Sequence, residues 1–208
     1  MKSKLLLCLL ACLALSSGAS AAGAPSDNEE KIAKGLLLQH EGRMIFSPCR
    51  HRSYYQLEDL SPNRGLTAQL TELGLADGKS LYVELQGALD DNRLRARNLN
   101  LARTESRCHE AGGPDELWRA AGQNAPWRFV AIAGELLLTR PGMPELKLAY
   151  TKVKSEDDRV ELVTPEKTEA VWRLRRQYCQ DKTAGMLFGW HAEIKVDGEI
   201  LQGCAWQR

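Results

Sequence analysis

Apolar and polar residues alternate along several short stretches of this chain, and a period of two is typical of β-strands. The clearest stretch spans residues 191–196, with the sequence HAEIKV. Asp197-Gly198 joins it to a second apolar-rich run, residues 199–204. An Asp-Gly pair between two such runs is a strong signal for a two-residue hairpin turn. The sequence therefore predicts an antiparallel β-hairpin in this part of the chain.

About five strands and one short helix are expected earlier in the sequence. Glu41-Gly42 separates two apolar-rich runs and indicates another hairpin. Leu66, Leu70 and Leu73 recur at helical spacing, and Gly74 follows them as a stop signal. This content is typical of a small β-barrel such as the OB-fold. The expected strands are residues 35–40, 43–47, 56–60, 81–87 (which alternates and is expected to be half-buried) and 93–101.

A second β-rich segment follows residues 110–114, which hold two glycines and a proline and indicate a domain boundary. Its expected strands are residues 127–133, 135–139, 146–150, 160–163, 172–174, 191–196 and 199–204. We therefore predict an all-β chain with an OB-fold-like small barrel, one short helix and a second small antiparallel β domain. The expected scheme is a signal peptide at 1–21, a flexible lead at 22–34, the barrel at 35–109, a linker at 110–117 and a disulfide-closed β domain at 118–208.

The first residues have the pattern of an export signal. Lys2 and Lys4 precede an apolar stretch, residues 5–15, and the small residues 19–21 follow as a cleavage site. The apolar stretch is about half of the roughly 20 residues that a transmembrane helix needs. We therefore predict a cleaved signal peptide, no transmembrane helix and a periplasmic protein. The alternative is an outer-membrane lipoprotein that is lipidated at Cys12.

Four of the six cysteines lie beyond the predicted signal peptide: Cys49, Cys108, Cys179 and Cys204. An even number of cysteines in an exported chain indicates disulfides, and four cysteines allow three connectivities. Their order along the chain favours Cys49–Cys108 and Cys179–Cys204, because each pair then sits inside one segment. Each half would then enclose its own crosslink and its own strands, so we expect few contacts to cross the boundary and each half to fold alone. A four-ligand metal site is the alternative, although no Cys-x-x-Cys spacing occurs.

Charge and motifs exclude several classes of function. Lys and Arg number 28 against 27 Asp and Glu, a formal net charge of +1, so the chain lacks the basic excess of a nucleic-acid-binding protein. The sequence has no nucleophile elbow, no zinc-protease motif and no phosphate-binding loop. We therefore predict a protein that is not an enzyme, needs no cofactor and binds no nucleic acid.

Two clusters are candidate partner-binding sites. The first combines basic and aromatic side chains in one short segment: Arg50, His51, Arg52, Tyr54 and Tyr55. On an OB-fold such a cluster could form a stacking platform for single-stranded nucleic acid. Export and the balanced charge favour the alternative, which is surface arginines beside a structural disulfide with tyrosines partly in the barrel.

The second cluster is Arg173 and Arg175, which strand geometry places on one face, opposite Trp172 and Leu174. These arginines could contact an acidic partner, anionic lipid or polysaccharide. Protection of an edge strand by charge is the alternative explanation.

A copper site is the remaining ligand hypothesis. It would use the imidazoles of His40 and His51 with the thioether of Met44 and a Cys49 that is free of its bridge. Such soft ligands suit copper, and His40 and Met44 lie on the two arms of the expected hairpin.

The first segment resembles the C-terminal OB-fold domain of the lipoprotein NlpE. The matching stretches are residues 35–38 (GLLL), 45–49 (IFSPC) and 81–87 (LYVELQG), with Cys108 at the end. NlpE-like proteins carry a Cys-x-x-Cys motif in a separate N-terminal domain. This chain has no such motif, so the resemblance implies the fold but not copper handling.

The second segment resembles a family of uncharacterised bacterial envelope proteins. The matching stretches are residues 122–127 (GQNAPW), 179–181 (CQD) with Gly185, Asp197-Gly198 and 203–205 (GCA). After Asp181 that family usually has a Met-Ser-Gly type sequence, which this chain lacks. The resemblance implies export and disulfides, and it implies no catalytic residue. We expect an exported interaction or sensing module, with a small-ligand or copper-binding protein that uses the barrel face as the alternative.

Overall fold

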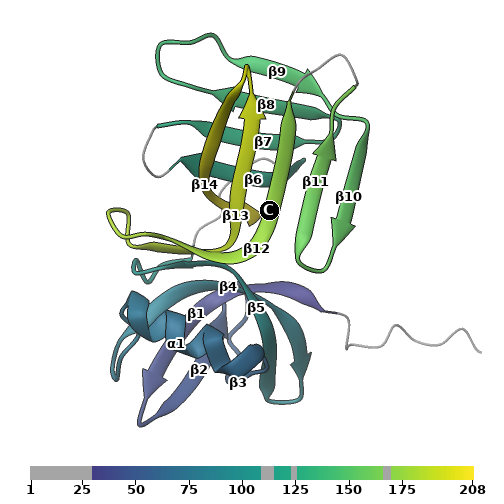
Figure 1. The fold of residues 1–208 in the computed structure, drawn as a ribbon. Helices are drawn as coiled ribbons and strands as arrows, with labels where there is room; N and C mark the ends of the chain where they lie inside the picture. The colour runs from purple at the N-terminus through teal and green to yellow at the C-terminus, as the bar shows by residue number, and fades with distance from the viewer. Residues whose placement is uncertain (1–29, 109–114, 123–125, 166–169) are drawn as a thin grey trace, which may run out of the picture.

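The computed structural model describes residues 30–108, 115–122, 126–165 and 170–208 (Figure 1). This part of the chain is almost entirely β-structure, with fourteen strands and one short α-helix. The strands belong to one continuous hydrogen-bonded sheet that forms a barrel and then a second unit above it in Figure 1. The predicted all-β fold class is thus confirmed. The predicted signal peptide, with Cys12, lies outside the described residues.

The barrel has the strand order of an OB-fold. β1 pairs with β2 and β4, β2 pairs with β3, and β4 pairs with β5. A parallel pairing of β3 with β5 closes the barrel. Its strands are β1 (Lys31–His40), β2 (Arg43–Pro48), β3 (Tyr55–Asp59), β4 (Ser80–Asp90) and β5 (Arg93–Arg103).

The only α-helix in the described part is α1 (Gly65–Leu73), which follows the short 3-10 turn Pro62–Arg64 between β3 and β4. It buries Leu66, Leu70 and Leu73 in the barrel core, as the leucine spacing predicts. Gly74 ends the helix with φ of 123°, a conformation that glycine adopts at little cost.

The second unit is an antiparallel sheet that curls on itself. Its strand order is β10-β11-β12-β13-β14-β6-β7-β8-β9. In Figure 1, β10–β14 form the front layer and β6–β9 lie behind them. Phe129 from the rear layer stacks on Trp172 from the front layer, with ring centroids 4.8 Å apart, so the two layers share one core. The strands are β6 (Glu116–Gly122), β7 (Arg128–Ile132), β8 (Glu135–Thr139), β9 (Leu146–Ala149), β10 (Lys152–Glu156), β11 (Arg159–Val163), β12 (Val171–Asp181), β13 (Met186–Val196) and β14 (Glu199–Gln207).

Both predicted hairpins are present. Glu41 and Gly42 have φ of 49° and 72°, and Asp197 and Gly198 have φ of 51° and 77°. Positive φ at both central residues is what a two-residue hairpin turn of the I′ type requires.

The predicted boundaries need correction. β1 begins at Lys31, so the end of the expected flexible lead, 22–34, is strand. β6 begins at Glu116, inside the expected linker, 110–117. Residues 22–29 and 109–114 lie outside the described residues. Two strands, β6 and β10, were not predicted: β6 begins inside the expected linker, and β10 is mostly polar.

The two units are joined more closely than the sequence suggests. Met186, Leu187 and Phe188, at the start of β13, pair with the end of β5 before the rest of β13 pairs with β14. Leu187 is buried in the barrel core. Phe188 belongs to a third cluster that also includes Tyr82 of the barrel and Cys204 of the second unit. The expectation that few contacts cross the boundary is therefore wrong.

Candidate binding surfaces

The predicted disulfides are both present. Cys49 is bonded to Cys108, and Cys179 is bonded to Cys204. Cys179 and Cys204 are buried in the cluster that joins the two units, Cys49 packs against its edge, and Cys108 is exposed. Two disulfides fit an exported protein in an oxidising environment. No helix in the described part of the chain has the length and apolar character that a membrane span requires.

The first candidate cluster does not form a stacking platform. Arg50, His51 and Arg52 are exposed in the segment between β2 and β3. Tyr54 is 72% exposed, whereas Tyr55 pairs with Phe46 of β2 and packs against the barrel core. A single aromatic ring is therefore presented beside these cations.

The residues of the copper hypothesis are not brought together. Cys49 is held in its disulfide. Met44 lies opposite Gln39 and packs against the barrel core, whereas His40 lies opposite Arg43 and is exposed. Alternate residues of a strand point to opposite faces, so the Met44 thioether and the His40 imidazole diverge.

The second candidate cluster lies on the outer face of the second unit, and its two arginines have different surroundings. Arg175 lies directly opposite Arg159 of β11 on one side and His191 of β13 on the other. These three residues form what we call the cationic row. Like charges directly opposite each other destabilise a sheet. An arrangement that costs stability in this way is a candidate for a binding role.

Arg173 lies in a balanced row next to the cationic one. Its Nη1 is 3.6 Å from Glu193 Oε1, and Glu161 lies opposite it on β11. Lys154 Nζ of β10 in turn lies 3.9 Å from Glu161 Oε2. Sequence alone groups Arg173 with Arg175, and only the pairing of the strands separates them.

His191 adds a titratable group to the cationic row. Its imidazole is half-buried, and burial lowers its pKa below the ordinary value of 6.5. Glu193 raises the pKa and Arg175 lowers it further, so the net direction is downward. The row therefore carries two charges at neutral pH and a third only in acid.

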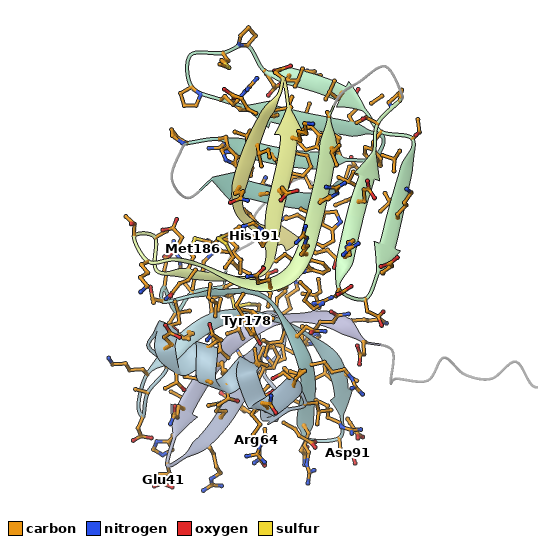
Figure 2. All side chains as sticks on the ribbon, in the orientation of Figure 1. Glu41, Arg64, Asp91, Tyr178, Met186 and His191 are labelled. Carbon is orange, nitrogen blue, oxygen red and sulfur yellow. A yellow bond between two sulfur atoms is a disulfide. The ribbon has the colours of Figure 1, made fainter. Side chains whose placement is uncertain are left out.

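A groove that the sequence does not predict runs along the junction of the barrel and the second unit. It has a volume of about 620 Å³ and lies between β5, β10 and β12. Arg97 and Arg176 enter it from opposite units. Figure 2 shows Tyr178 at the same junction.

A second hollow lies at the far end of the barrel, where Figure 2 shows Glu41, Arg64 and Asp91. It has a volume of about 580 Å³, and Arg43, Arg64 and Arg93 line it. Arg64 has a left-handed backbone, with φ of 53° and ψ of 38°, just before α1.

Asp59 lines the same hollow but serves the fold. It accepts hydrogen bonds from the backbone amides of Ser61 and Thr67, each at 2.8 Å, and from the Ser61 hydroxyl. Burial raises the pKa of Asp59, but these hydrogen bonds outweigh burial and lower it overall. The carboxylate therefore uses its hydrogen bonds to hold the start of α1.

Comparison of the chain with protein-family models, curated proteins and solved structures found no match.

Proposed function

We propose that this chain is an exported, non-enzymatic binding protein of the cell envelope, located in the periplasm, which uses the cationic row to dock an acidic surface of a partner protein. The observation that carries the proposal is the placement of Arg175 directly between Arg159 and His191. An acidic partner would relieve the repulsion within this row, and complementary charges favour both specificity and rapid association.

The surroundings of the row support a protein partner. Ile200 lies on the same face, opposite Lys195, and is 60% exposed. The core of a protein interface combines apolar side chains with arginine, which is enriched there. The two disulfides support export. A relationship of the barrel to the NlpE C-terminal domain is part of the proposal, supported by the OB-like strand order.

Site-specific photo-crosslinking in living cells tests this function. A photoreactive residue in place of Arg173 would lie beside the row and leave Arg159, Arg175 and His191 intact. The matched control replaces Tyr54, which is 72% exposed on the barrel. We expect a protein adduct from position 173 and none from position 54. Adducts only from position 54, or only lipid or polysaccharide adducts from position 173, would contradict the proposal.

A second candidate function is small-ligand binding at the far end of the barrel. The hollow there lies on the β2–β3 side between the β1–β2 and β4–β5 turns, the region that OB-folds use for ligands. The barrel shares this region with other OB-folds by its fold alone. Loss of ligand binding in an Arg64→Ala variant with an intact cationic row would favour it.

A further inference from the structure

Two cavities meet at the junction of the units, and the same three side chains line both. Arg97 and Asn98 come from β5, and Arg176 comes from β12. The larger cavity is the groove of about 620 Å³, and the smaller has a volume of about 240 Å³. Sites that bind small molecules are common where two units of a protein meet.

Arg176 is held in place before any ligand arrives. Its Cζ lies 4.2 Å from the centre of the Trp190 ring, and its Nε donates a hydrogen bond of 3.0 Å to the backbone oxygen of Asp157. Within the described residues, its two Nη groups have no hydrogen-bond partner. A guanidinium fixed on an aromatic face presents its donors at a low entropic cost, and these donors fit the oxygens of a carboxylate or phosphate.

The charge of Arg176 is incompletely compensated. Burial lowers its pKa, and this effect outweighs the opposite influence of Asp157, Asp158 and Glu30. A half-buried cation with such a balance gains from a further anion in contact with it. Arg97 brings a second guanidinium to the same place, with its Nε 2.5 Å from Glu30 Oε1.

The smaller cavity limits the size of the uncharged part of the ligand, which we call its body. Pro62, Leu99 and Gly189 give it an apolar wall, and Tyr178 contributes a ring that is 37% exposed. Tyr178 lies in the irregular part of β12, where the register with β13 shifts between Arg176 and Cys179. The volume is below the usual range of about 300–1,000 Å³ for drug-sized ligands, so a compact body fits.

The two cavities differ in charge. Glu30, Glu156 and Asp157 line the larger cavity, whereas none of the described residues that line the smaller one carries a carboxylate. An anion between Arg97 and Arg176 would therefore keep its body in the smaller cavity.

We infer that this junction binds a small organic oxyanion, whose carboxylate or phosphate lies between Arg97 and Arg176 and whose ring-sized body lies against Tyr178. The site is separate from the cationic row, so it does not depend on the proposed partner.

Titration of the isotope-labelled full chain by NMR tests the inference with three probes: phenylacetate, its neutral analogue phenylacetamide, and phenyl phosphate. We expect at least one anion to bind with a Kd of about 10 mM or tighter and to shift the amide signals of residues 97–98 and 176–178. Phenylacetamide should bind at least about tenfold more weakly than phenylacetate, because it cannot form charge-assisted hydrogen bonds with the arginines. The stronger of the two anions identifies the natural headgroup. Absence of shifts at the junction, or equal binding of the amide, would overturn the inference.

Arg97→Gln and Arg95→Gln form a matched pair of variants. Both arginines are exposed on β5 and paired with a glutamate, but only Arg97 lines the junction. We expect R97Q to weaken anion binding about tenfold and R95Q to leave it unchanged. An equal loss in both variants would show a non-specific effect of charge and overturn the inference.

Discussion

The side-chain amide of Asn100 and the backbone of Gln207 bond to each other in both directions. Asn100 Nδ2 donates to Gln207 O at 2.8 Å, and Gln207 N donates to Asn100 Oδ1 at 2.7 Å. Asn100 belongs to β5 of the barrel, and Gln207 ends β14 of the second unit. Asn100 Nδ2 also donates to Glu84 Oε2 at 2.7 Å, and the Tyr82 hydroxyl donates to Glu84 Oε1 at 2.8 Å. A buried polar network thus anchors the second unit on the barrel.

Asn100→Ala should destabilise the whole chain. The substitution removes the hydrogen-bond donor of Glu84 Oε2, on a residue that is 2% exposed, and both partners of the Gln207 backbone, so we expect a loss of about 2–4 kcal/mol in the free energy of unfolding. Asn98→Ala is the control, because Asn98 is half-buried and makes one long hydrogen bond to Gln86. This variant should lose less than about 1 kcal/mol in the free energy of unfolding. Equilibrium denaturation in urea measures both. Equal losses would mean that the network does not join the units.

Gly189→Ala should disrupt the junction itself. A Cβ at this position would lie 1.7 Å from the backbone oxygen of Leu99, so β13 and β5 would have to separate. We expect a loss of about 3 kcal/mol, measured by thermal or denaturant unfolding. Gly65→Ala is the control, because a Cβ at the start of α1 would make only an ordinary van der Waals contact with the Tyr178 ring, 3.9 Å away, and it should be neutral or slightly stabilising. A neutral Gly189→Ala would contradict the close approach of the two strands.

Local sequence signals predicted much of the fold. Asp197-Gly198 and Glu41-Gly42 identified their hairpins, and Leu66, Leu70 and Leu73 identified α1, because turns and amphipathic elements depend on neighbouring residues. The disulfide pairing also followed from the order of the cysteines.

Long-range packing was beyond the sequence. Alternation in β4 predicted a half-buried strand, but Tyr82 and Glu84 on its outer face are buried, because the second unit covers them. The pKa of Tyr82 is raised, first by burial and then by Glu84. The cationic row depends on the register of three strands, so a sequence that shows Arg175 cannot show that Arg159 and His191 flank it.

The two disulfides should differ in their resistance to reduction. Cys179 and Cys204 are 6% and 2% exposed, whereas Cys49 is half-buried and Cys108 is exposed. Since thiol–disulfide exchange requires access to a sulfur atom, a mild dithiol under native conditions should reduce Cys49–Cys108 first. Alkylation followed by peptide mass spectrometry measures the order. Simultaneous reduction, or earlier reduction of Cys179–Cys204, would contradict the burial of the second bridge.

His191 should make stability dependent on pH in mildly acidic solution. Its pKa is lowered in the folded state, so the unfolded chain binds the proton more readily as the pH falls below 6.5. The contribution of His191 is therefore fully present above pH 6.5 and is lost as the pH falls toward the folded pKa. His191→Gln should lose less stability than the parent chain between about pH 7 and pH 5. Unfolding curves across this range measure the difference, and parallel profiles would exclude a lowered pKa.

Recovery of the partner by charge-reversed variants tests the proposed function most directly. Arg159→Glu with Arg175→Glu reverses two charges in the cationic row, and Arg93→Glu with Arg95→Glu reverses two exposed charges on the barrel. Each pair changes the net charge equally, so a general effect of charge is controlled. We expect the first pair to lower the amount of partner that co-purifies from envelope extract at least about tenfold, and the second to retain it. Retention by both variants, or an equal loss in both, would contradict a partner site at the cationic row.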